Sequence, residues 1–452
     1  MRRAVISMLR LCGEMCRTSA LAALLLCGAV ALDPVLPGDV ISGAVAQDDK
    51  PKKDQRETRR TPALRNKVYE KLAEAQTLAE AKDYAGAAVI LNDMIAEDGK
   101  RALNSYELAN VYNLFAFLAY ATEDYPQSLR YYEQVIAQPD IPLAMEINTR
   151  FTIAQLYFVQ EKWQQGIDAM LVWFDLNEKP NAGAYVLLAQ GYYQVKKYDL
   201  ALENVETAIS MHEGEGKLPK EQWYNLARFL YFDKEDFDSA LDVLNTLIIY
   251  YPKKQYWVQA SHLYGEKKEE QKQLALMEAA YEQGFLDRSS ELVTMAYLYL
   301  NAEVPYYAGS VIEQGFKDEL VDDKSKNYEL GGSAWAQARE VAKSIPMMEK
   351  AAAKSDEGEL YVRLGNVYLD GDQFAKAADS VNKGLKKGGV KRPDQARLVL
   401  GMAYFNLGEY NKARKAFRDA GKDDRSEKYA RQWIAYVSSE EERQRELEKD
   451  LF

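Results

Sequence analysis

The fold of this chain is decided by the stretch AQGYYQVKKYDLALENV, residues 189–205. Its first half places the small residue Ala189 three positions before Tyr192. Its second half has an aromatic, a small and an apolar residue at helical spacing, Tyr198-Ala201-Val205. Apolar residues three and four positions apart share one face of a helix. The stretch therefore predicts two antiparallel helices that cross closely at a small side chain, with a large ring filling the space one turn further on.

The pattern of the second half recurs ten times. Its first residues are Tyr84, Tyr125, Trp163, Tyr198, Phe237, Glu270, Pro305, Val341, Phe374 and Tyr410. Nine residues earlier stands a small residue, namely Ala75, Ala116, Ala154, Ala189, Ser261, Ala296, Gly332, Gly365 or Gly401, and only Arg228 departs. A mean period of about 36 residues with two helices per repeat is typical of the tetratricopeptide repeat.

The repeat predicts an all-α fold, a tetratricopeptide superhelical solenoid of about ten helix–turn–helix repeats over residues 62–422. Residues 423–452 are expected to form a C-terminal capping helix with an acidic tail. A length of 452 residues alone would suggest two or three domains, but the continuous repeat favours one solenoid. The eighth repeat, NYELGGSAWAQAREVAKS, is degenerate, and its sequence leaves open whether it is well formed or loosened. Most of the 31 tyrosines are then packing residues.

The N-terminus has the features of an export signal. Four arginines precede the apolar run ALAALLLCGAVAL at residues 20–32, which is too short to span a bilayer comfortably. We predict a signal peptide over residues 1–46, cleaved after Ala46, although residues 29–31 offer a second site and Met8 or Met15 a later start. Leu26 before Cys27 disfavours a lipid anchor. The mature protein is expected in the periplasm without a membrane span, and its charged linker, residues 47–61, is expected to be disordered.

The sequence offers little for catalysis. All three cysteines lie in the first 27 residues, and the two histidines, His212 and His262, are 50 residues apart. We interpret His212 as part of a solvated glycine-rich loop and His262 as a half-exposed helix residue. We therefore expect no metal, no cofactor and no enzyme activity. A net charge of −11 disfavours nucleic acid as a partner, because phosphate backbones repel acidic surfaces.

A candidate binding surface lies on the first helices of the second to fifth repeats, which line the concave side of such a solenoid. Its exposed positions hold uncharged aromatic and amide residues, which we call the aromatic–amide row: Asn113, Phe117, Tyr120, Phe151, Gln155, Phe158, Gln190, Tyr193, Asn225, Phe229 and Phe232. Val186 is the aliphatic residue at these positions. Amides can pair with the backbone of an extended peptide, and rings can hold its side chains or prolines.

The alternative is that neighbouring repeats cover these rings, and the residues leave both interpretations open. The corresponding positions of the eighth repeat, Glu329, Ser333 and Ala336, are small and polar. The partner site is therefore expected in the N-terminal half.

Several stretches resemble the tetratricopeptide proteins of gammaproteobacteria whose genes accompany a TonB–ExbB–ExbD energy-transduction system. They are RRTPALR at 59–65, LNSYELANVYNLFAF at 103–117, AQLYFVQEKWQQGI at 154–167, YPKKQYWVQ at 251–259, EAAYEQGFL at 278–286, and the segment from GELYVRLGNVYL to KRPDQARLVLGMAYFNLGEYNKA between 358 and 413. The resemblance covers nearly the whole mature chain. The long leader with its cysteines departs from the family, as does the degenerate eighth repeat.

The resemblance implies an accessory of TonB-dependent transport, such as iron uptake across the outer membrane. The implied partners are TonB, ExbD or a TonB-dependent receptor, and a proline-rich stretch of the kind found in TonB proteins would suit the row. The family has no catalytic residues to transfer. The alternative is a scaffold for outer-membrane or cell-wall assembly complexes, which the same surface chemistry would serve.

Overall fold

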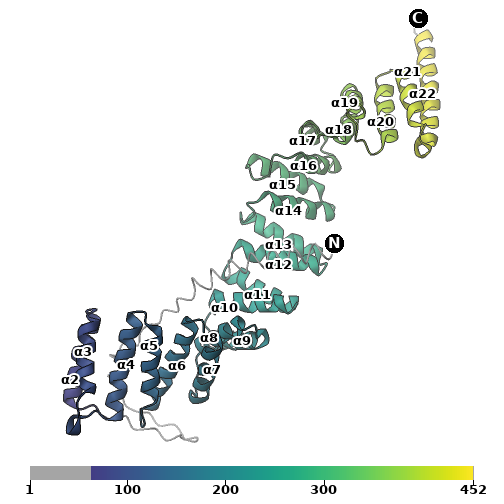
Figure 1. Ribbon diagram of the computed structural model, residues 1–452. Helices are drawn as coiled ribbons and strands as arrows, with labels where there is room; N and C mark the ends of the chain where they lie inside the picture. Colours follow the sequence, from purple (N-terminus) through teal and green to yellow (C-terminus); the bar gives the residue numbers. More distant parts are fainter. Residues whose placement is uncertain (1–62, 451–452) are drawn as a thin grey trace. The chain divides into compact units, whose positions relative to one another are not determined.

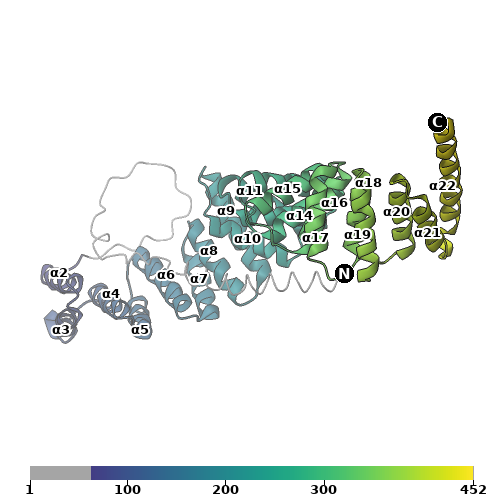
Figure 2. The ribbon, with the colours of Figure 1, turned by 90° about the horizontal axis from the view of Figure 1, so that it is seen from above.

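The computed structural model describes residues 63–450, and all of their regular secondary structure is helical. The predicted signal peptide and the whole charged linker precede these residues, so both predictions lie outside the described part of the chain. Within it, the helices follow one another in pairs (Figures 1 and 2).

The helices follow the predicted repeat. The first helices are α2 (Asn66–Glu80), α4 (Ser105–Ala121), α6 (Leu143–Val159), α8 (Ala182–Gln194), α10 (Glu221–Asp233), α12 (Lys254–Glu266), α14 (Ser289–Asn301), α16 (Ser325–Gln337), α18 (Glu359–Asp370) and α20 (Pro393–Asn406). The second helices are α3 (Tyr84–Ile95), α5 (Tyr125–Ile136), α7 (Trp163–Leu176), α9 (Tyr198–Gly214), α11 (Phe237–Tyr250), α13 (Glu270–Glu282), α15 (Pro305–Lys317), α17 (Val341–Ala353), α19 (Phe374–Lys387) and α21 (Tyr410–Ala420). A short 3-10 turn, η2 (Gly99–Arg101), precedes α4, and α22 (Asp424–Asp450) follows α21. Each of the ten predicted pattern residues opens a second helix, so the predicted all-α repeat fold is confirmed.

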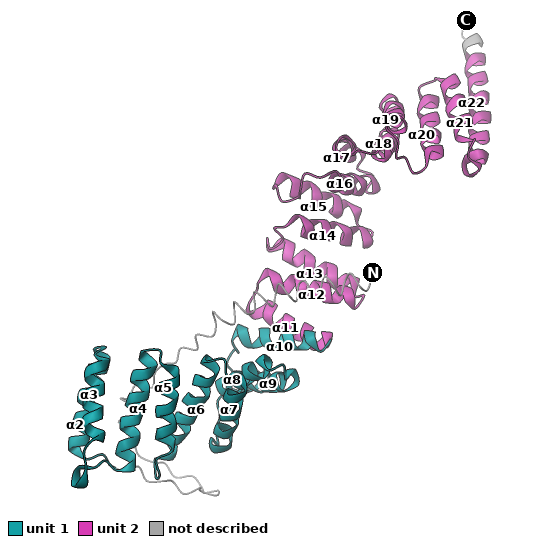
Figure 3. Ribbon diagram, in the orientation of Figure 1, with its two compact units in different colours: residues 1–235 teal, residues 236–452 magenta. Residues whose placement is uncertain are grey.

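Two compact units divide the chain, Met1–Glu235 and Asp236–Phe452 (Figure 3). Within each unit, every helix packs against the next helix along the chain. The division falls between α10 and α11, the two helices of the fifth repeat, and α10 carries Arg228 where other first helices have a small residue. One uninterrupted solenoid over residues 62–422 stays a prediction.

The small residues lie where the two helices of a repeat cross. Ala189 is fully buried, and a Cβ atom added to Gly401 would lie 2.5 Å from the ring of Phe417. A larger side chain would have to push the helices apart, because packed interiors leave no spare volume. The predicted helix register is therefore the register of the core.

Every turn inside a repeat has the same backbone conformation. The residue two positions before the second helix has a positive φ and is Lys82, Glu123, Glu161, Lys196, Glu235, Lys268, Glu303, Arg339, Asp372 or Gly408. Nine of these ten are charged residues held in the left-handed region, which costs a residue with a Cβ atom about 1 kcal/mol or more. Their side chains are exposed to solvent.

The eighth repeat is well formed, which its degenerate sequence had left open. Its two glycines bring α16 against neighbouring side chains, since a Cβ atom on Gly332 would lie 2.7 Å from Met348. Buried Ser344 on α17 donates a hydrogen bond of 2.7 Å to the carbonyl of Gly332. Glycine and serine here are thus contact residues of a close helix crossing.

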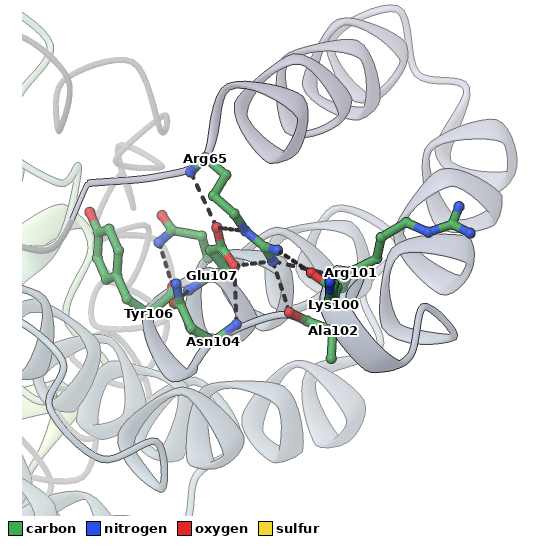
Figure 4. A network of polar contacts seen from close by, with 8 residues as sticks. Arg65, Lys100, Arg101, Ala102, Asn104, Tyr106 and Glu107 are labelled. Carbon is green, nitrogen blue, oxygen red and sulfur yellow. Dashed lines mark hydrogen bonds and ion pairs between the residues drawn. The ribbon is translucent and has the colours of Figure 1, made fainter.

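A polar network fixes the start of the first repeat (Figure 4). Glu107 on α4 is fully buried, and its carboxylate accepts hydrogen bonds from Nε and Nη2 of Arg65, at 2.8 and 2.7 Å. It also accepts a bond from the backbone of Asn104, whose side chain caps α4 in return. Arg65 Nη2 reaches the carbonyl of Ala102 at 2.8 Å. Burial alone would raise the pKa of Glu107, but these donors outweigh it and hold the pKa below its ordinary value.

The last helix closes the end of the second unit, as predicted. Val437 on α22 is fully buried with Ala413 and Phe417 of α21, and Trp433 stacks on Phe417 with 5.3 Å between ring centroids. Beyond this contact, the exposed half of α22 forms ion pairs such as Arg443–Glu440 and Arg445–Glu441. Such pairs three and four residues apart support an exposed helix.

Candidate functional site

The aromatic–amide row lies on four first helices of unit 1: α4, α6, α8 and α10. Ten of its eleven residues are half-buried, which leaves part of each side chain open to solvent. Half-buried rings and amides are suited to a contact surface, because they are held in place but still accessible.

Phe158 is the exception, and its expected place on an exposed surface is wrong. Only 7% of the residue is exposed. Its ring occupies the space left by two glycines, since Cβ atoms on Gly166 and Gly191 would lie 2.6 and 2.7 Å from it. Phe158 therefore packs α6 against α7 and α8. Val186 is also buried.

Two rings of the row meet between α8 and α10. Tyr193 and Phe229 contact each other edge to face, with 5.4 Å between their centroids. Tyr193 also packs against Tyr198 at the start of α9, at 5.7 Å. Edge-to-face pairs hold both rings in a fixed orientation. The row is therefore continuous across the two repeats.

Toward the N-terminal end, the rings take more part in packing. Phe151 lies 4.9 Å from the buried Trp173, and Tyr120 lies 5.7 Å from Tyr125. Burial, followed by the influence of Tyr125, raises the pKa of Tyr120, so its hydroxyl is neutral and able to donate. Phe151 and Tyr120 therefore serve partly as packing residues.

The amides differ in how they are used. Asn225 donates to the carbonyl of Glu221 at 3.1 Å and accepts from Arg228 at 3.0 Å. In contrast, the side chains of Gln155 and Gln190 are half-buried and form no hydrogen bond with any residue from 63 to 450. A primary amide offers two donors and one acceptor, which is the set that an extended backbone matches.

Arg228 is the charged residue that sequence reasoning registered only as a break in the small-residue pattern. Its guanidinium contacts the row through Asn225. The hydrophobic periodicity of α10 carries no signal for this role. Arg228 reaches Asn225 because the two residues are three positions apart on one face of α10.

The described residues add no other site for chemistry. His212 belongs to the last turn of α9 and packs against Trp223 at 4.6 Å, so its interpretation as a solvated loop residue is wrong. His262 is exposed. Between residues 63 and 450, no cluster of three or more His, Cys, Asp and Glu side chains is arranged to bind a metal ion. No helix in that range has the length and apolar character needed to cross a bilayer.

Comparison with known proteins agrees with the repeat. A family model described as tetratricopeptide repeat matches residues 362–427, in α18 to α22. No curated protein sequence matches this chain. The tetratricopeptide fold of the chain thus rests on this match and on the helix register.

Several solved structures are similar to this chain at low sequence identity. YrrB, described as a TPR protein with an unusual peptide-binding site, is 16% identical, covers 38% of this chain and 85% of its own, and has a TM-score of 0.32. MamA is 19% identical over 37% of this chain and 90% of its own, with a TM-score of 0.33. A tetratricopeptide repeat protein from Parabacteroides merdae is 15% identical over 67% of this chain and 100% of its own, with a TM-score of 0.32.

Proposed function

We propose that this protein is a non-catalytic scaffold that binds an extended segment of a partner protein on the aromatic–amide row of unit 1. One observation carries the proposal. The two glutamines with unused amides, Gln155 and Gln190, lie on successive first helices, α6 and α8. Helix α8 also carries Tyr193 of the Tyr193–Phe229 ring pair. Tetratricopeptide arrays work through extended surfaces of this kind.

The partner we propose is a proline-rich, uncharged segment. None of the eleven residues of the row is charged, and Arg228 beside Asn225 is, among the described residues, the one cation that the structure places against it, so the row is best matched by an uncharged ligand. Rings dock prolines of a polyproline II segment, and free amides bind the carbonyl groups that such a segment leaves exposed.

We further propose that the partner belongs to a TonB–ExbB–ExbD system and that binding takes place in the periplasm. The support is the sequence resemblance over nearly the whole mature chain and the export features of residues 1–46. In this setting the scaffold holds TonB, ExbD or the periplasmic part of a receptor during nutrient uptake.

The test is a photo-crosslinking amino acid placed at residue 193 in living cells, with captured proteins identified by mass spectrometry. The control is the same amino acid at Tyr250, an exposed tyrosine of unit 2. Capture of TonB, ExbD or a receptor at 193 but not at 250 is the expected result. Capture of an assembly-machine or cell-wall protein would overturn the TonB assignment and keep the scaffold.

A binding measurement separates the groove from the partner's identity. Replacing Gln155 and Gln190 by alanine should weaken binding of a proline-rich peptide by about tenfold or more, because two hydrogen-bonding side chains are lost. The control pair Gln76→Ala and Gln164→Ala changes glutamines elsewhere in unit 1 whose amides bond to Glu80 and Asp168. Equal binding by both variants would contradict the proposed groove.

A further inference from the structure

A basic patch in unit 2 is a second surface that the row does not explain. Lys383, Lys386 and Lys387 lie on the end of α19, and Lys391 lies in the loop to α20. Lys350 belongs to α17, which packs against α18. From residue 380 to residue 393 the sequence has five cations and no acid, in a chain of net charge −11.

Two buried tyrosine rings hold three of these lysines in place. The Nζ atoms of Lys383 and Lys387 lie 4.4 and 5.7 Å from the ring centroid of Tyr361. Lys350 Nζ lies 5.2 Å from the centroid of Tyr328. A ring face attracts a cation without neutralising it, so the positive charge stays available at the surface.

Three other ring-stacked lysines of unit 2 also have an acid partner, whereas Lys376, which lies over the ring of Tyr368, has none among the described residues. Lys272, Lys343 and Lys412 each stack on an aromatic ring and pair with the glutamate three residues earlier, at 2.5, 3.6 and 2.7 Å. None of the five patch lysines has an ion pair with any described residue.

The acids that surround the patch are mostly occupied. Asp323 pairs with Lys354 at 2.7 Å, Asp394 with Arg392 at 2.6 Å, and Glu359 lies 3.6 Å from Arg363. Glu359 also accepts the backbone N–H of Lys391. Glu357 beside Gly389 and exposed Asp379, four residues before Lys383 on α19, form no ion pair with any described residue. The five lysines outnumber these two acids, so a net excess of positive charge remains.

The loop that carries Lys391 adds backbone donors. Gly388 and Gly389 have φ values of 86° and 69°, and the carbonyl of Gly388 accepts a bond of 2.7 Å from Gly358. The N–H groups of Gly389 and Val390 have no hydrogen-bond partner among residues 63–450. Free N–H groups next to lysines are ready to bind carboxylates.

We propose that Lys350, Lys383, Lys386, Lys387 and Lys391 form a docking surface for an acidic, Asp- and Glu-rich segment of a partner protein. Charge complementarity identifies the occupant. A membrane is disfavoured because no large apolar side chain is exposed between Leu320 and Leu407, so the patch has nothing to insert between lipids. The protein thus has two surfaces of different chemistry, one uncharged in unit 1 and one basic in unit 2.

The test is fluorescence anisotropy with a labelled glutamate-rich peptide and its glutamine counterpart. The full chain should bind the glutamate peptide alone, and binding should weaken as salt screens the charges. Replacing Lys383, Lys386, Lys387 and Lys391 by glutamine should lower affinity about tenfold or more, because contacts with four cations are lost. The charge-matched control replaces Lys67, Lys100, Lys179 and Lys220 of unit 1 and should bind like the wild type.

A second variant distinguishes loss of binding from loss of folding. Lys386→Glu with Lys391→Glu leaves both ring-stacked lysines of α19 in place and should abolish binding while the helical circular dichroism is unchanged. The proposal is overturned if either patch variant binds like the wild type, if the unit 1 control loses as much, or if no glutamate peptide binds. Sedimentation with anionic phosphatidylglycerol vesicles, without peptide binding, would assign the patch to a membrane instead.

Discussion

The hydroxyl of Tyr157 on α6 donates a hydrogen bond to Glu133 on α5, with 3.4 Å between the two oxygen atoms. This bond ties the first helix of one repeat to the second helix of the repeat before it. The same relationship recurs at two further pairs, Tyr231–Glu206 and Tyr368–Glu349. In each case the tyrosine stands three residues after the helix-crossing position, so its ring fills the core and its hydroxyl joins neighbouring repeats.

Removing one hydroxyl should weaken this tie without opening a cavity. Tyr368→Phe keeps the buried ring and leaves Glu349 accessible to water, so we expect a loss of about 1 kcal/mol in the free energy of unfolding. Urea unfolding followed by circular dichroism measures it. Tyr250→Phe is the control, because Tyr250 is 56% exposed. Equal loss in both variants would refute the role of the hydroxyl.

Alkaline pH should lower the stability of the fold by ionising buried tyrosines. Burial, then nearby Tyr120, raises the pKa of Tyr132 to about 12, and burial with Glu349 raises the pKa of Tyr368 as well. A raised pKa means that the fold prefers the neutral phenol. This stability is complete below the ordinary tyrosine pKa of 10.0 and is lost as pH rises from there through the folded value.

The thermal midpoint should therefore fall as pH increases beyond 10.0 and toward about 12 for Tyr132. Tyr132→Phe should make that fall shallower, and Tyr250→Phe should leave it unchanged. A midpoint that is flat over this range in the wild type would contradict the prediction.

Acid should lower the stability of the fold by protonating Asp394, which is 2% exposed. Hydrogen bonds from Arg392, at 2.6 Å, hold the pKa of Asp394 well below its ordinary value against the effect of burial, and Ser426 donates a further bond at 2.7 Å. A lowered pKa contributes stability above the ordinary value of 3.8, and this stability is lost as pH falls below it toward the folded value.

Asp394→Asn should lower the free energy of unfolding by about 2 kcal/mol at neutral pH, because charge-assisted bonds are lost. The difference from wild type should shrink as acid protonates Asp394. Urea unfolding at neutral and strongly acidic pH measures both effects. Asp356→Asn, at an exposed acid, should change neither, and a pH-independent difference at residue 394 would exclude ionisation as the cause.

The helix register is tested by filling a crossing point. Gly401→Leu places a side chain where the Phe417 ring already lies and should cost about 1–3 kcal/mol. Gly214→Ala, at a glycine with nothing within 4 Å of the added atom, should be nearly neutral. An unchanged melting temperature for Gly401→Leu would mean that the helices do not cross there.

Periodicity was enough to predict the helices. The first pattern residue of each repeat, such as Tyr84 or Pro305, opens a second helix because helix starts and packing positions share one register. Even the sixth repeat, whose pattern begins with the polar Glu270, follows the period. Periodicity left the eighth repeat open, and there Gly331 and Gly332 permit a closer crossing, which compensates for missing large side chains.

The candidate site was less predictable. Spacing placed Phe158 on the same helix face as Gln155. The ring is buried because Gly166 and Gly191, on other helices, make room for it. The pattern of α6 alone therefore could not predict the burial of Phe158. The bond between Arg65 and Glu107 joins residues 42 positions apart. Asn104 and Glu107 have the spacing of a capping box, but no local pattern identifies the arginine that neutralises the buried acid.

The strained turns have an evolutionary consequence. Nine repeats keep a charged residue in a backbone conformation that glycine adopts without cost, and the tenth, at Gly408, already has glycine. Exchange between glycine and a charged residue at this one site trades backbone strain against disorder of the unfolded chain, with little effect on packing. Selection can therefore adjust the free energy of unfolding of the array one repeat at a time, in small increments, while both proposed binding surfaces stay unchanged.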